Sequence, residues 1–169
     1  MLALALPHDA AREHLRELAG RSVIDLSGAV KRDGTGVYGM VESPVPGTWY
    51  GNPGCMAMGV ILGVRRCGAV LDGPLHITAI GGASYAPRDQ TGTLRVANRT
   101  LSHPHVAEIE RAVGAAIASF LPVQSVVGTD AVVLRAEQHD EHLTLTVGLD
   151  NLTLPATNAV RLASLLLEA

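Results

Sequence analysis

Apolar side chains recur at a spacing of three and four residues in four stretches of the chain, and this spacing predicts four helices. The first follows Asp9, a residue that can cap it, and it stops at Gly20. The third begins at Ser102, and its apolar stripe continues as far as Phe120. The fourth begins near Pro155 and carries apolar residues almost to the last position of the sequence.

The second of these helices, over about residues 53–67, has the clearest boundary signals. An asparagine lies at its cap, a proline occupies its first position, two arginines lie in its last turn, and Gly68 closes it. Two internal glycines each lower its intrinsic stability by about 1 kcal/mol, so packing must hold it in place. A buried strand over residues 58–64 is the alternative assignment for this stretch.

Shorter apolar runs between the helices predict strands. A turn signal at 31–36 separates runs at 22–30 and 37–41, which is typical of a β-hairpin. Further strands are expected at 69–71, 75–80 and 93–97, followed by a three-stranded meander at 123–127, 131–137 and 143–149.

The resulting element order is α-β-β-α-β-β-β-α followed by β-β-β-α. Because hairpins dominate this order, it predicts an α+β fold with a mostly antiparallel sheet and packed helices. We expect a single domain over residues 1–169. The alternative is a core module over 1–121 with an appended meander and helix over 122–169.

Composition then limits the classes of function. The 169 residues are 47% hydrophobic and only 17% charged, against a usual charged share of about 25%. These are too few charged residues to cover the surface of a monomer. We therefore expect some apolar surface to contact a partner, and we expect a homo-oligomer. A net charge of -3 and five aromatic residues, one Phe, one Trp and three Tyr, argue against a nucleic-acid binder.

No stretch matches a targeting or membrane segment. The apolar N-terminus is interrupted by Pro7, and no unbroken apolar run approaches the roughly 18 residues of a membrane span. Two cysteines do not make a disulfide framework. We therefore expect a cytoplasmic protein that does not bind membranes, and no motif indicates a cofactor.

One segment suggests chemistry. If Asn52 caps the second helix, Cys55 lies in its first turn, where backbone N–H groups and the helix dipole stabilise a thiolate. The amides of Gly54 and Cys55 would stabilise an oxyanion, and His76 is the nearest histidine along the chain that could act as the base. The catalytic candidates are therefore Cys55 and His76.

A ligand-binding wall is expected beside this helix start. Two aromatic rings precede the cap, and the same amides that stabilise a thiolate can bind an anionic group. The candidate ligand-binding residues are Trp49, Tyr50, Asn52 and Gly54.

Four histidines form a third group of candidates. His103 and His105 flank a proline at the start of the third helix, and His139 and His142 bracket a turn between two strands. Imidazoles with nearby carboxylates are suitable zinc donors, yet the spacing matches no established metal signature. Two polar turns with solvated histidines are the alternative, and we predict no metal site.

We favour a non-catalytic, self-associating α+β module that binds a protein or a small ligand. The first alternative is a small cysteine-dependent enzyme for acyl or amide transfer or hydrolysis, with Cys55 as nucleophile. The second is a metal-binding protein that uses the four histidines. Whether the protein is an enzyme stays open at this stage.

Overall fold

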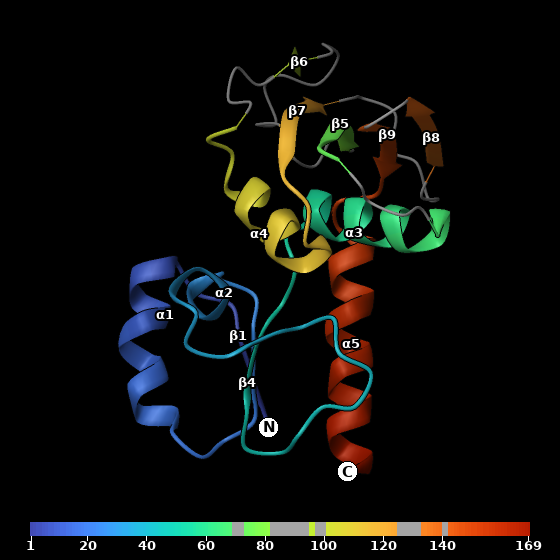
Figure 1. Cartoon of the computed structure of the whole chain (residues 1–169). Coiled ribbons are helices and arrows are strands. Elements are labelled where there is room, and N and C mark those ends of the chain that lie inside the picture. Colours follow the sequence, from blue (N-terminus) through green and yellow to red (C-terminus); the bar gives the residue numbers. More distant parts are fainter. Residues whose placement is uncertain (69–72, 82–94, 97–100, 125–132, 140–141) are drawn as a thin grey trace. The chain divides into compact units, whose positions relative to one another are not determined.

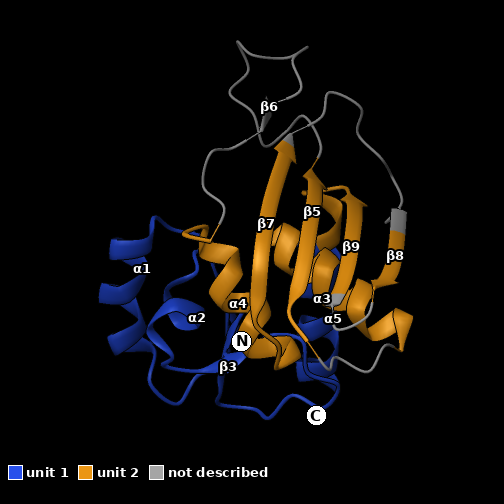
Figure 2. Cartoon of the chain, turned by 45° about the horizontal axis from the view of Figure 1, so that its top comes forward, with its two compact units in different colours: residues 1–53, 155–169 blue, residues 54–154 orange. Residues whose placement is uncertain are grey.

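The computed structural model describes residues 1–68, 73–81, 95–96, 101–124, 133–139 and 142–169. The chain forms two compact units (Figure 2), with unit 1 made of residues 1–53 and 155–169 and unit 2 of residues 54–154. Each unit contains its own sheet (Figure 1). The boundary considered at residue 122 lies inside β7 (Ile117–Gln124), a strand of unit 2.

Unit 1 is built around a four-stranded sheet in the order β1-β2-β4-β3, and every pair in it is parallel. Its strands are β1 (Leu2–Leu4), β2 (Val23–Asp25), β3 (Val37–Tyr38) and β4 (Trp49–Gly51). Its helices are α1 (His8–Leu15), the 3-10 helix η1 (Arg16–Leu18), α2 (Ala29–Asp33) and most of α5 (Thr153–Glu168).

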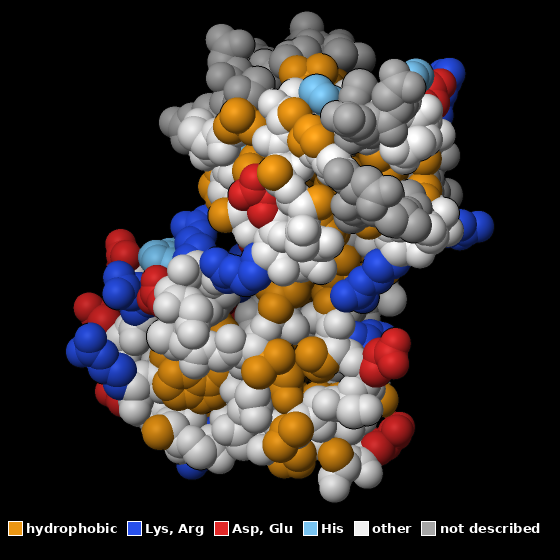
Figure 3. All heavy atoms as spheres, in the orientation of Figure 1, with side chains coloured by type: hydrophobic (Ala, Val, Ile, Leu, Met, Phe, Trp, Pro, Cys, Tyr) orange, Lys and Arg blue, Asp and Glu red, His pale blue; other side chains and the backbone are white. Residues whose placement is uncertain are grey.

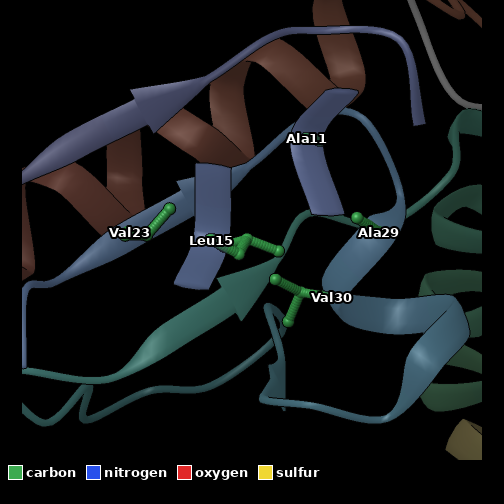
Figure 4. Close-up of a cluster of buried hydrophobic side chains, with 5 residues drawn as sticks. All are labelled: Ala11, Leu15, Val23, Ala29 and Val30. Carbon is green, nitrogen blue, oxygen red and sulfur yellow. The ribbon is translucent and has the colours of Figure 1, made fainter. Parts of the chain in front are cut away.

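Alternation along β2 gives unit 1 a hydrophobic core on each face of its sheet. Val23 packs with residues of α1 and α2 (Figure 4), in a cluster made of Ala11, Leu15, Val23, Ala29 and Val30. Its neighbour Ile24 points to the other face and packs with Tyr50 of β4 and Leu162 of α5. Since successive side chains of a strand face opposite sides, two adjacent residues anchor both helical layers.

The β-hairpin expected over residues 22–41 is wrong. Both β2 and β3 pair with β4, which lies between them in the sheet. The apparent turn signal at 31–36 contains the end of α2, where Gly34 adopts a left-handed conformation with φ of 66°. A short helix therefore provides the crossover that parallel strands require.

Unit 2 has a five-stranded sheet in the order β6-β7-β5-β9-β8. The three central strands are parallel to one another, and the two edge strands are antiparallel to their neighbours. The elements of this unit besides β7 are α3 (Cys55–Cys67), β5 (Leu75–Gly81), β6 (Arg95–Val96), α4 (Pro104–Val113), β8 (Val133–His139) and β9 (His142–Leu149).

Helices α3 and α4 cover the same face of this sheet (Figure 2). Alternate residues of β5 are buried beneath them, and Gly81 at the end of β5 lies against Met56 in the first turn of α3. Gly59, in the next turn of α3, lies against Leu149 at the end of β9. Helix α3 therefore begins at the carboxyl edge of the parallel strands.

The prediction of a mostly antiparallel sheet is wrong for both units. The sheet of unit 1 is parallel, and the sheet of unit 2 is mixed with a parallel centre. The predicted meander over 123–149 is also wrong, because β5 lies between β7 and β9. Only the β8–β9 hairpin survives from it. An α+β content with both helices and strands is confirmed.

The third predicted helix is shorter than expected. Helix α4 ends at Val113, where Gly114 adopts a left-handed conformation with φ of 72°, and the following residues form β7. A register shift between β5 and β7 leaves Ala118 as an extra residue, so the buried residues Ile117 and Phe120 stand three apart. This bulge gives a strand the spacing of a helix.

The other helix predictions are confirmed. Residues 55–67 are helical as α3, so the alternative strand over 58–64 is wrong, and the first and last helices lie where their spacing placed them. Strand β5 matches the expected strand at 75–80, whereas the expected strand at 69–71 lies outside the described residues. In the described part of the chain, no helix combines the length and the hydrophobicity needed to cross a bilayer.

Candidate functional site

Cys55 is the first residue of α3. Gly54 is the N-cap, with an extended backbone (φ −65°, ψ 146°), so the cap lies two residues later than the sequence suggested. In an α-helix, the N–H groups of the first turn have no acceptor within the helix and carry the positive end of its dipole. The thiol of Cys55 is half-buried at this point, and it forms no disulfide.

Helix α4 places an imidazole directly against this cap. A Cβ added to Gly54 would lie 2.5 Å from Cδ2 of His105 and closer still to Nε2, inside the distance that real Cβ atoms keep. Only glycine, which has no side chain, leaves room for the ring. The Nε2 edge of His105 therefore faces the backbone one residue before the thiol of Cys55.

His103 orients this imidazole. It is the N-cap of α4, and its Nδ1 accepts the backbone N–H of His105 at 3.2 Å. Its ring stands edge-on to the His105 ring, with centroids 4.7 Å apart, and lies 5.1 Å from the Phe120 ring. Because Nδ1 accepts a hydrogen bond, the neutral ring carries its proton on Nε2.

Glu108 joins the two helices. One carboxylate oxygen, Oε2, accepts the backbone N–H of Gly54 at 3.0 Å, and the residue is only 7% exposed. Since this amide is already bonded, it is not available to an oxyanion as the sequence suggested. The amide of Met56, in the first turn of α3, is one that the helix geometry offers instead.

The structure does not bring His76 to Cys55. His76 alternates with the buried positions of β5, so it faces away from α3, and its Nδ1 lies 2.9 Å from the hydroxyl of Ser119. It stands five residues before Gly81, the residue that contacts the start of α3. At the rise of a strand, five residues correspond to about 16 Å.

The three candidate ligand residues that precede Pro53 belong to unit 1 and have structural contacts there. The indole of Trp49 donates to the carbonyl of Leu18 at 3.2 Å. The hydroxyl of Tyr50 accepts the N–H of Val45 at 2.6 Å. Asn52 donates to the carbonyl of Pro155 at 3.0 Å and accepts from Asn158 at 2.9 Å, which ties α5 to the end of β4.

The four histidines lie at different ends of unit 2. His139 and His142 flank the β8–β9 turn, at the amino edge of the parallel strands, because Leu143 pairs with Leu75. His103 and His105 lie at the start of α4, against the start of α3. Among the residues that the structure describes, no group of three or more His, Cys, Asp or Glu side chains could hold a metal ion.

Sequence reasoning found Cys55, treated His103 and His105 only as metal candidates, and missed Glu108. One signal was present in the sequence: a proline lies close to each helix start, followed by His105 in α4 and, two residues later, by Cys55 in α3. Helices that cross back over parallel strands begin at the same edge of the sheet. No family model matches the chain, and no curated protein or solved structure resembles it.

Proposed function

We propose that the protein is a cysteine-dependent enzyme that transfers or hydrolyses an acyl group. The observation that supports this most directly is the His105 imidazole against Gly54, immediately before Cys55 at the start of α3. A nucleophile, a base and helix-terminal amides are the three components that acyl transfer through a thioester requires. The reducing cytoplasm expected from the sequence would keep such a thiol active.

The proposed reaction has two halves. His105 accepts the thiol proton of Cys55, the sulfur attacks the carbonyl carbon, and the amide of Met56 at the start of α3 stabilises the oxyanion. The leaving group departs with the proton from His105 and leaves a thioester on Cys55. Water or an acceptor nucleophile then attacks the thioester with His105 again as base, and the free thiol is restored.

The first test is the pH dependence of Cys55 alkylation by iodoacetamide in a Cys67→Ala background. We expect the midpoint to lie below the ordinary thiol value of about 8.5, because an imidazolium beside the thiolate stabilises it. His105→Asn should return the midpoint to the ordinary value, whereas His139→Asn, at the other edge of the sheet, should leave it unchanged. An ordinary midpoint in the parent protein would remove the proposal.

The second test detects the covalent intermediate. Incubation with p-nitrophenyl acetate should add one acetyl group to Cys55, detected by intact mass and peptide mapping, and hydroxylamine should remove it as a thioester. Acetylation should be lost in Cys55→Ala and strongly slowed in His105→Asn. Acetyl groups distributed over lysine and serine instead would indicate unspecific chemistry.

A second proposal concerns self-association, which the non-catalytic interpretation of the sequence also requires. Within unit 2, no described helix covers the face of the sheet opposite α3 and α4 (Figure 2). Its central strands expose part of His76, Thr78 and Ile80 from β5 and of Thr144 and Thr146 from β9. Parallel strands are usually covered on both faces, so we propose that a second copy of the chain covers this one.

The charges on this face favour a second copy over a charged partner. Neither β5 nor β9 contains an acidic residue, lysine or arginine. On the edge strand β8, Arg135 and Glu137 form an ion pair with each other, in register with Thr146 and Thr144. A neutral face with a balanced rim is complementary to itself, as a two-fold interface requires.

A further inference from the structure

We infer that Glu108 is a positioning residue that keeps Cys55 and His105 together by holding the backbone amide of Gly54. This inference rests on the acyl-transfer function proposed above. It assigns to Glu108 a role in the site that does not involve contact with the substrate.

The geometry places both side chains of α4 on one residue of the α3 cap. His105 and Glu108 are three positions apart, so they share a face of α4. His105 lies against the Cα of Gly54, and Glu108 accepts the N–H of the same residue at 3.0 Å. Because Cys55 follows Gly54 directly, these two contacts together hold the backbone of Cys55 next to the imidazole.

The burial of Glu108 makes its hydrogen bond to Gly54 important. A carboxylate that is 7% exposed loses most of its hydration, and it needs hydrogen bonds to offset this loss. The amide at Gly54 and the positive ends of the two helices supply favourable interactions. What the site requires from residue 108 is therefore an acceptor that reaches as far as the Gly54 amide.

Glu110 provides a matched control within the same helix. Its Oε1 accepts the backbone N–H of Ile117 at 3.0 Å, so it makes the same kind of bond at nearly the same distance. That bond joins α4 to the start of β7 and involves no residue of the site. Removing the Glu110 carboxylate therefore shows how much the loss of such a bond changes Cys55 alkylation through the structure of α4 alone.

The experiment measures iodoacetamide alkylation of Cys55 against pH in the Cys67→Ala background, with three variants. Glu108→Gln keeps an acceptor of the same reach and removes the charge. Glu108→Asp keeps the charge and withdraws the acceptor by one methylene. Glu110→Ala is the control. The titratable groups at the two helix starts are Cys55, His103, His105 and Glu108, and only the last changes in the two site variants.

If Glu108 acts through the amide, Glu108→Asp should lower the rate constant at pH 7 by about tenfold, which corresponds to a shift of one unit in the midpoint. Glu108→Gln should stay within about twofold of the parent, and so should Glu110→Ala. Near-ultraviolet circular dichroism verifies that each variant is folded. The Asp and Gln variants retain polar side chains of similar size, so the comparison does not depend on a cavity mutant.

Three outcomes would overturn the inference. If Cys55 were alkylated in Glu108→Asp as fast as in the parent protein, the contact with the Gly54 amide would not matter. If the alkylation rate fell equally in Glu108→Asp and Glu108→Gln, the site would need the glutamate carboxylate itself and not only an acceptor of the right reach. An ordinary alkylation midpoint in the parent, unchanged by His105→Asn, would refute the proposed function itself and the role of Glu108 with it.

Discussion

Glycine at position 54 is the residue on which the proposed site depends most directly. Gly54→Ala would push a methyl group into the His105 ring, because the position of the new Cβ is already occupied. We expect slower alkylation of Cys55 and a lower urea midpoint of unfolding. In the double variant Gly54→Ala/His105→Ala the stability loss should largely disappear, since the ring is gone. Additive losses in the double variant would place the clash elsewhere.

Asp25 is a second residue whose contacts predict a measurable effect. It is fully buried, its Oδ1 accepts the N–H of Ser27 at 2.8 Å, and its Oδ2 accepts the N–H of Val30 at 2.8 Å. Asp25→Ala leaves the buried amide of Val30 and the partly buried amide of Ser27 without their acceptor. An unsatisfied buried group costs about 1–3 kcal/mol. Asp33→Ala, which removes a partly exposed ion pair with Arg12, should cost less than about 1 kcal/mol. Urea denaturation measures both, and equal losses would contradict the expectation.

At this scale, the sequence predicted one member of the site and not its partners. Cys55 could be placed at a helix start because the signals for that start are local. His105 and Glu108 lie fifty and more positions away, and their proximity depends on how two helices cross one sheet. Proximity along the chain therefore favoured His76, which the alternation of β5 turns to the opposite face.

At the scale of elements, the start of α5 makes a pH-dependent contribution to the stability of the folded state. The Thr153 N–H, the Leu152 N–H and the Thr153 hydroxyl all donate to the Asp150 carboxylate, and they hold its pKa below the ordinary value of 3.8. A lowered pKa stabilises the folded state above the unfolded value, and this contribution is lost as the pH falls through the folded value.

Asp150→Ala should therefore lower the melting temperature near neutral pH, and the difference from the parent should shrink below pH 3.8. Thermal unfolding at a series of pH values measures this difference. Glu13→Ala on the exposed surface of α1 is the control and should show no such convergence. A difference that stays constant down to pH 2 would show that the hydrogen bonds of Asp150 do not depend on its charge.

Strand pairing was the part of the fold that the sequence could not specify. Helix starts and stops depend on neighbouring residues, and α1, α3 and α5 were predicted from them. Pairing depends on which distant strand lies alongside, and β4, which the sequence did not predict as a strand, lies between β2 and β3 in the unit 1 sheet. Short runs such as β3 look the same in a hairpin and in a parallel sheet.

At the scale of the whole molecule, the composition of the surface bears on self-association. Figure 3 shows hydrophobic side chains at the surface of unit 1. The exposed large apolar residues of this unit include Leu2, Leu6, Leu26, Val37, Val45, Val160 and Leu167. Scattered residues of this kind occur in most proteins. The face of the unit 2 sheet opposite α3 and α4 differs from them, because it is continuous across three strands and carries no net charge.

The final prediction is that the chain is a dimer through this sheet face. Light scattering at tens of micromolar should give twice the monomer mass of 17.6 kDa. Thr146→Arg places a cation on β9 beside Arg135 of the edge strand, and such cations from two copies would approach each other across a two-fold interface. This variant should be a folded monomer, whereas Thr157→Arg on the exposed surface of α5 should remain a dimer.

A parent protein that is monomeric would refute the interface, and a dimer that persists in Thr146→Arg would place it on another surface. Neither result would affect the Cys55 chemistry, because α3 and α4 lie on the opposite face of the sheet.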